Sequence, residues 1–174
     1  GPDGEVAQWL ADNRVDIGFV TLPDARFDTF PLMEDQLVAL LPLEHPLAKK
    51  NAVTLEELCA SPFAMTRAGS EDIIGGLFRT LRLRPNIRWR SLQLVSTIAA
   101  VARGEAVSIV AESALPPEET PGYVKKSLRP PARRQVGLAV PDARRMSPAA
   151  REFIRMAQEV FPHPAHSAAR PTTR

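Results

Sequence analysis

One stretch, residues 62–83, constrains the fold most, because it combines a strand, a polar loop and a helix. Residues 63–65 form a short apolar strand, and apolar residues recur at helical spacing over 73–81. Ser70 suits the N-cap of that helix, and its hydroxyl is expected to cap it. A strand that ends at a helix N-terminus gathers free backbone N–H groups where open α/β sheets bind small ligands. A capped helix without any ligand explains the same residues.

The rest of the chain alternates between strand and helix patterns, which predicts an α/β fold with a largely parallel sheet. Pro31 interrupts an extended segment at 27–34, and Arg129-Pro130-Pro131 separates two of the predicted strands. Strands are predicted at 15–21, 36–41, 86–91, 107–110, 123–128 and 135–140, and helices at 3–13, 54–60, 94–102 and 147–161.

Three local patterns define where helices begin and end. Thr54 and Glu57 match a capping box, in which each residue bonds the backbone of the other. Ser147-Pro148 is a strong helix start, because proline is favoured at the first helical position. Gly104 suits the position just after the helix at 94–102, where a left-handed residue commonly ends the helix.

Composition excludes several classes of function. The chain has 22 basic and 20 acidic side chains, so its net charge of +2 does not demand a nucleic-acid partner. Arginine clusters, including Arg133-Arg134, are predicted to be solvated surface. The single cysteine excludes an internal disulfide, and no spacing of ligands resembles a zinc site, so no metal or cofactor is predicted. No apolar run is long enough to span a membrane.

Six stretches then follow one another in a characteristic order: RVDIGFV (14–20), QLVALLPLEHPLA (36–48), LEELCASPFAMTRAGS (55–70), LVSTIAAVARGEAVSIV (94–110), VGLAV (136–140) and MSPAAREFIRMA (146–157). In this order they resemble the effector-binding domain of LysR-type transcriptional regulators. The resemblance covers about residues 5–161. It departs slightly at Ala106, where the family more often has glycine.

The resemblance implies a two-lobed, type 2 periplasmic-binding-protein-like α/β fold with an effector cleft between the lobes. The first lobe would comprise residues 1–42 and the return segment 138–162, the second lobe 43–137, and a flexible tail 163–174. The usual first strand and helix of the domain are expected before Gly1, and that strand would pair beside residues 15–21.

The resemblance also implies an effector site made of polar residues at strand ends and helix starts, with no catalytic residue. Arg67, beside a helix N-terminus, favours an anionic effector such as a carboxylate. Asp3 is equally explained as a helix cap, Arg67 as a solvated loop residue, and Ser96 as tolerated packing. The implied contacts are Asp3 and Thr21 on the first lobe and Thr66, Arg67, Gly69, Ser70 and Ser96 on the second.

The implied function is regulation in the cytoplasm. The domain would sense a small molecule and transmit this to a winged helix-turn-helix that reads DNA and lies outside these residues. It would assemble as a homo-dimer or tetramer, without a membrane partner. Two alternatives remain, a periplasmic-type solute-binding protein and an enzyme on the same fold. The sequence offers no nucleophile–base pair in favour of the enzyme.

Overall fold

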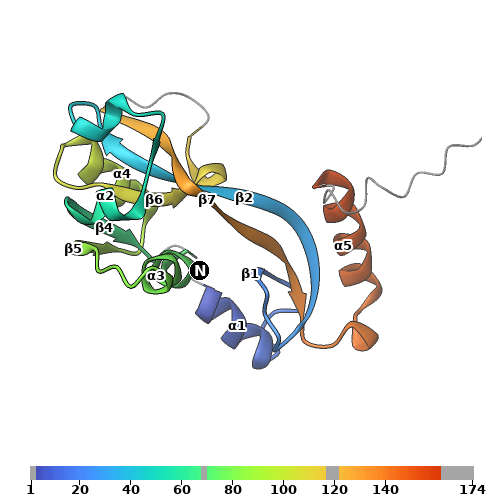
Figure 1. Cartoon of the computed structure of the whole chain (residues 1–174). Helices are drawn as coiled ribbons and strands as arrows, with labels where there is room; N and C mark the ends of the chain where they lie inside the picture. Colours follow the sequence, from blue (N-terminus) through green and yellow to red (C-terminus); the bar gives the residue numbers. More distant parts are fainter. Residues whose placement is uncertain (1–2, 68–69, 117–121, 162–174) are drawn as a thin grey trace, which may run out of the picture. The chain divides into compact units, whose positions relative to one another are not determined.

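The computed structural model describes residues 3–67, 70–116 and 122–161 (Figure 1). The chain divides into two compact units, Gly1–Glu34 with Gln135–Arg174, and Asp35–Arg134. It crosses between them within the strands β2 (Asp28–Pro42) and β7 (Tyr123–Val140). The sequence predicts crossings near Pro42 and Gly137, and the observed ones lie earlier because both strands continue through them.

The remaining elements alternate along the chain largely as the sequence predicts. The described helices are all too short or too polar to cross a membrane. The elements are α1 (Asp3–Ala11), β1 (Gly18–Leu22), β3 (Ala52–Val53), α2 (Leu55–Cys59), β4 (Pro62–Thr66), α3 (Glu71–Thr80), β5 (Asn86–Ser91), α4 (Leu94–Ala102), β6 (Ser108–Ala111) and α5 (Pro148–Val160), with short 3-10 turns at Pro46–Lys49, Glu112–Ala114 and Ala143–Arg145.

β2 and β7 are each one long strand, whereas the sequence predicts two shorter extended segments in place of each. Pro31 lies inside β2, and Pro130 and Pro131 lie inside β7. Proline fixes φ near a value that an extended chain accepts, so it can lie within a strand. What it removes is one N–H donor. β2 pairs with β6 through residues 37–40, so Pro31 removes no hydrogen bond from this pairing.

The prediction of a largely parallel sheet is wrong for the main sheet, whose strand order is β1-β7-β2-β6. β1 runs antiparallel to β7, and β2 runs antiparallel to β6. Parallel pairing joins β3 to β7 and β4 to β5. An apolar pattern identifies a buried strand but carries no information about its direction relative to a neighbour. β1 stands at the end of the strand order, and the further strand expected beside it stays a prediction.

In the first unit, two helices cover opposite faces of the sheet. Leu138 and Val140 of β7 pack with Ile154 of α5. The intervening Ala139 packs with Leu10 of α1. Because successive strand residues point to opposite faces, α1 and α5 lie on different sides of β7.

The second unit repeats this arrangement around β2 and β6. Leu41 packs in the same core as Phe63 of β4 and Phe78 of α3, whose rings meet edge to face at 5.5 Å. Leu40 instead packs with Ile98 of α4. One face of the β2–β6 pair is therefore covered by α3 and the other by α4. β4 lies beside β6, because Phe63 forms a parallel bridge with Val107, the residue before β6.

Three of the predicted helix ends are confirmed by their local geometry. Thr54 Oγ1 accepts from the Glu57 N–H at 3.3 Å, and the Glu57 carboxylate accepts from the Thr54 N–H at 2.9 Å. Ser147 Oγ accepts from the Ala150 N–H at 3.1 Å. Gly104 follows α4 with a φ of +78°, which is the left-handed conformation that glycine adopts without strain.

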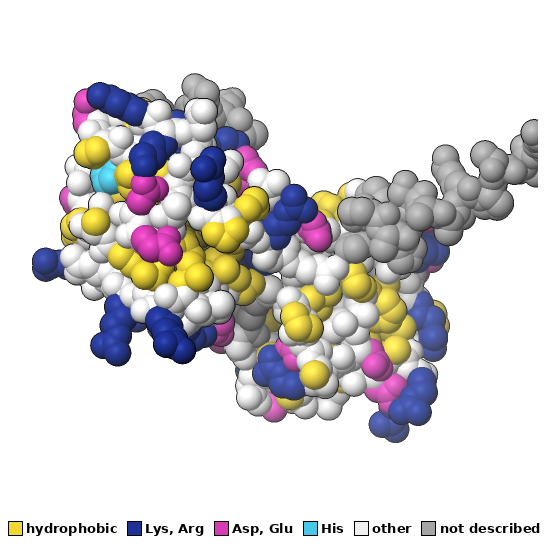
Figure 2. Space-filling view, in the orientation of Figure 1, with side chains coloured by type: hydrophobic (Ala, Val, Ile, Leu, Met, Phe, Trp, Pro, Cys, Tyr) yellow, Lys and Arg dark blue, Asp and Glu magenta, His cyan; other side chains and the backbone are white. Residues whose placement is uncertain are grey.

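Charged side chains are mostly scattered over the surface, as the sequence predicts. On the face shown in Figure 2, Lys and Arg side chains are interspersed with acidic and apolar ones. Arg134 contradicts the prediction, because its side chain is only 14% exposed and lies 2.8 Å from the carboxylate of Asp35. Its acidic partner is 99 residues away in sequence, so no local pattern indicates this burial.

The hydroxyl of Thr97 on α4 gives a first test of the packing. Thr97 is 1% exposed, and its Oγ1 has no hydrogen-bond partner in the described part of the chain. Thr97→Val should raise the free energy of unfolding by about 1 kcal/mol, because it replaces an unsatisfied hydroxyl with a methyl group of similar size. The measurement is urea denaturation. As a control, Thr97→Ser keeps the hydroxyl and should lower stability by about 0.8 kcal/mol for the lost methyl group. A Thr97→Val variant that is less stable than the wild type would contradict the burial of an unpaired hydroxyl on α4.

His45 gives a second test, through pH. Its Nδ1 accepts from the Leu47 N–H at 3.2 Å, so the neutral ring carries its proton on Nε2, which lies 2.9 Å from Ser61 Oγ. Burial lowers the pKa of His45 below its ordinary value. The unfolded chain therefore takes up a proton more readily than the folded one, and the free energy of unfolding should fall as the pH drops below about 6.5 and through the folded pKa.

The matched control for this pH effect is His45→Asn, whose amide oxygen accepts from the same N–H but does not titrate. Thermal denaturation at several pH values should show the difference in stability between wild type and variant shrinking or reversing as the pH falls. A constant difference across this range argues against a protonation-sensitive His45.

Candidate functional site

The candidate site lies in the second unit, at the edge where two parallel strands end. Thr66, the last residue of β4, pairs with Ser91, the last residue of β5. The Arg67 N–H donates to the Ser91 carbonyl at 2.8 Å and extends this pairing. α3 and α4 begin shortly after the two strands. Carboxyl ends of parallel strands followed by helix N-termini are common binding places for small ligands.

Three charged side chains surround the start of α3. The Glu71 carboxylate lies 3.2 Å from Arg67 Nε and also accepts a hydrogen bond from Arg90 of β5. Both arginine side chains are 54% exposed, so water weakens each ion pair. Asp72 in the first turn of α3 adds a second negative charge, so the acidic and basic side chains balance here. The guanidinium groups and the first N–H groups of the helix are nevertheless donors that suit an anion.

Ser70 occupies the N-cap position of α3, but its hydroxyl makes no capping hydrogen bond to the helix. It is 3% exposed, and its Oγ accepts instead from Arg134 Nη1 at 3.1 Å. The predicted position of Ser70 is therefore right and its predicted capping role is wrong. A guanidinium group brought from β7 competes for the hydroxyl, and the first N–H groups of α3 lack the acceptor that an N-cap serine commonly gives.

Arg134 is itself held by Asp35, at the start of the second unit. Its Nε donates to Asp35 Oδ2 at 2.9 Å, and Nη2 lies 2.8 Å from the same oxygen. Ser113 adds two bonds to this carboxylate, from its backbone N–H at 3.1 Å and its hydroxyl at 2.7 Å. Sequence reasoning missed all three residues. The one available signal was Asp35 itself, a charged residue beside the apolar run at 36–41.

The structure brings some of the predicted site residues together. Thr66 (3% exposed), Arg67 and Ser70 lie together at the end of β4. Ser96 is exposed in the first turn of α4, and Gly69 lies outside the described residues. Asp3 belongs to α1, with its side chain outside the described part, and Thr21 lies in β1, opposite Val136. Both belong to the first unit, so their contribution to the site stays a prediction.

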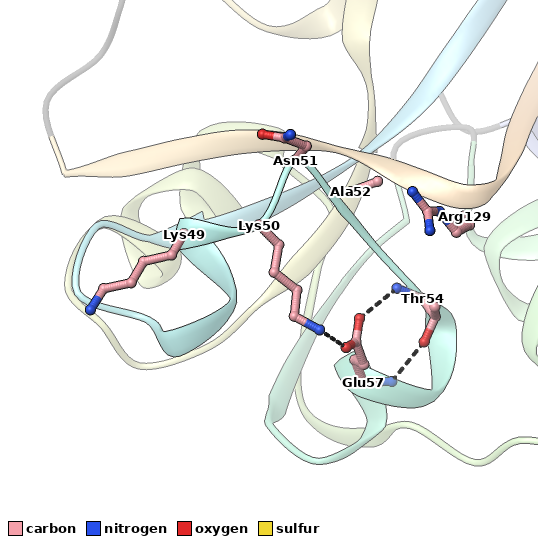
Figure 3. A pocket seen from close by; sticks show the side chains of 7 residues that line it. All are labelled: Lys49, Lys50, Asn51, Ala52, Thr54, Glu57 and Arg129. Carbon is pink, nitrogen blue, oxygen red and sulfur yellow. Dashed lines mark hydrogen bonds and ion pairs between the residues drawn. The ribbon is translucent and has the colours of Figure 1, made fainter.

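A cavity of about 440 Å³ elsewhere in the same unit is a weaker candidate (Figure 3). The Glu57 carboxylate accepts from Lys50 and from the Thr54 N–H, and the Lys50 hydrogen bond lowers the pKa of Glu57. Figure 3 shows Lys49 pointing away from this group. Glu57 is already engaged by Lys50, whose side chain is half exposed. The cavity therefore offers a ligand surface cations and no buried polar group, which makes it a weak binding site.

The chemistry of the β4–β5 edge suits binding. Its donors are backbone N–H groups, hydroxyls and guanidinium groups, and the carboxylates of Glu71 and Asp35 are each engaged by arginine. Asp72 adds a further carboxylate in the first turn of α3. Among the residues that the structure describes, no three His, Cys, Asp or Glu side chains are placed to hold a metal ion.

Comparison with known proteins points to one family. The family described as the LysR substrate binding domain matches residues 1–162. The HTH-type transcriptional regulator YvbU of Bacillus subtilis (strain 168), named as uncharacterized, is 29% identical over 162 residues, which are 92% of this chain and 56% of YvbU. The chain thus spans little more than half the length of that relative.

Solved structures agree with this fold. The regulatory domain of CcmR from Synechocystis PCC6803, in complex with 2-PG, superposes with a TM-score of 0.83 at 19% identity, over 92% of this chain and 80% of CcmR. The effector binding domain of QuiR, in complex with shikimate, gives 0.80 at 19% identity, over 93% and 79%. These are LysR-type domains with the periplasmic-binding-protein-like fold.

The relatives are named as transcriptional regulators, which favours the regulator over the enzyme and the solute-binding protein. By its sequence and its fold, this chain belongs to the LysR substrate-binding domain family.

Proposed function

We propose that this chain senses a small molecule for a bacterial LysR-type transcriptional regulator, and that the molecule binds at the carboxyl ends of β4 and β5. The observation that carries the proposal is the group of Thr66, Arg67 and Ser70 beside the N-terminus of α3. In support, CcmR and QuiR were solved with 2-PG and shikimate. Asp3, Thr21, Gly69 and Ser96 complete the proposed set of contacts.

The remaining partners of the whole protein follow from the family. A winged helix-turn-helix domain outside this chain would read DNA, and the regulator would act in the cytoplasm as a homo-dimer or tetramer. Exposed apolar residues give physical support for self-association, because Leu92 and Val95 are 63% and 68% exposed at the start of α4.

The proposed effector is an anion such as a carboxylate. Arg67 and Arg90 share the one carboxylate of Glu71, so both guanidinium groups keep donors for an anion, while Glu71 and Asp72 in the first turn of α3 oppose its charge. The buried Ser70 hydroxyl and the uncapped N–H groups of α3 add donors directed at the same place. A cationic or wholly apolar effector would leave these donors without acceptors.

Binding is tested first by its effect on stability. At a concentration one hundred times its dissociation constant, a bound ligand raises the free energy of unfolding by about 2.7 kcal/mol. Shikimate, benzoate and inorganic phosphate are suitable anionic probes in thermal denaturation. The uncharged methyl ester of shikimate is the matched control and should give a smaller shift than shikimate. If only the ester stabilises the protein, the proposal of an anionic effector is rejected. If no compound of any charge binds, the proposal that this chain is a sensor is rejected.

Two substitutions should change the affinity for a bound anion in opposite directions. Arg67→Gln removes a charged donor and should raise the dissociation constant about tenfold. Glu71→Gln releases both Arg67 and Arg90 from their shared carboxylate and should lower it. Arg88→Gln, which removes the same charge from an exposed position on β5, is the control and should change affinity less than twofold. Calorimetric titration measures the dissociation constant of all three variants. If Arg67→Gln and Arg88→Gln weaken binding equally, Arg67 contributes only through the overall charge of the protein.

A further inference from the structure

The ion pair of Asp35 and Arg134 joins the two ends of the second unit, since these are its first and last residues. The Asp35 side chain is 2% exposed and that of Arg134 is 14% exposed. Asp35 holds the guanidinium at Nε and Nη2, and the two Ser113 donors hold the carboxylate in turn. The third nitrogen, Nη1, thereby has a defined position, from which it donates to Ser70 at 3.1 Å.

Ser70 has two competing uses for its hydroxyl oxygen. At an N-cap, a serine oxygen accepts from the N–H of the second or third helical residue, which here are Asp72 and Ile73. In the structure it accepts from Arg134 instead, and no such cap forms. A hydrogen bond from a charged guanidinium is stronger than one from a neutral amide, and it orients the Ser70 side chain toward Arg134. The Ser70 backbone, at φ −129° and ψ −2°, also departs from the extended conformation usual at an N-cap. The amides of Asp72 and Ile73 then lack a side-chain acceptor from Ser70.

We propose that Arg134 is a positioning residue of the effector site. By holding the Ser70 oxygen, it keeps the first-turn amides of α3 open for an anionic group and directs the remaining Ser70 proton away from the guanidinium. This inference rests on the proposed function, because it concerns the same site, but Arg134 acts through Ser70 without contacting the effector. An effector that bonds to Ser70 also acts on the ion pair that joins the two ends of the unit.

The decisive variant is Arg134→Met, which removes every donor while keeping an unbranched side chain. Ser70 is then free to cap its own helix, and solvent exchange of the Asp72 and Ile73 amides, measured by NMR without ligand, should slow about fivefold. A merely structural role predicts the opposite sign, namely faster exchange as α3 loosens. Arg134→Lys keeps the charge without the planar fork and should also slow exchange. Adding Ser70→Ala to Arg134→Met should abolish the slowing.

Arg133→Met, on the exposed neighbouring residue, is the matched control and should leave both exchange rates unchanged. Where the loss of Arg134 alone prevents folding, Asp35→Asn with Arg134→Met removes both buried charges and serves for the same measurement. Unchanged or faster exchange at Asp72 and Ile73 in these variants overturns the proposal.

Titration with shikimate and inorganic phosphate separates this inference from the proposed function. For whichever of the two binds the wild-type protein, Arg134→Met should raise the dissociation constant at least fivefold and Arg133→Met less than twofold. An unchanged constant in Arg134→Met overturns the positioning role even where the exchange slows. Should none of shikimate, benzoate and inorganic phosphate bind the wild type, the proposed anionic effector fails, while the exchange rates still decide whether Arg134 prevents capping by Ser70.

Discussion

The buried ion pair between Asp35 and Arg134 is the interaction on which the second unit most depends. Removing one partner of such a pair typically costs about 3–5 kcal/mol, because the other charge is left buried without compensation. The pair is fully engaged here, since Ser113 bonds the carboxylate and Ser70 bonds the guanidinium. It also lies where the chain enters and leaves the unit, so the geometry of both long strands is tied to the start of α3.

The site depends on packing that places two helix starts beside two strand ends. Alternate residues of β2 and β6 bury α3 on one side and α4 on the other. The parallel pairing of β4 with β5 then places Thr66 opposite Ser91, with Arg67 and Arg90 close enough to share Glu71. An anion at this edge would meet two guanidinium groups, the Ser70 hydroxyl and the first amides of α3.

Local patterns predicted most of the elements and part of the site. The capping box at Thr54 and the serine–proline start of α5 were predicted correctly, because both depend on residues a few positions apart. The family resemblance rested on the order of such segments. Two predictions failed because they treated a local signal as decisive. Pro31 and the prolines of β7 do not end their strands, and strand direction does not follow from an apolar pattern.

By itself, the sequence determined where most of the strands and helices lie, the family of the domain, and the polar character of the loop after β4. Only the tertiary structure decided what those polar groups do. The Ser70 hydroxyl accepts from a residue 64 positions away, and that arginine is held by an aspartate 99 positions from it. A serine before a helix caps that helix unless a stronger donor reaches it first. Whether one does depends on the path of β7 through the fold, which no spacing near Ser70 records.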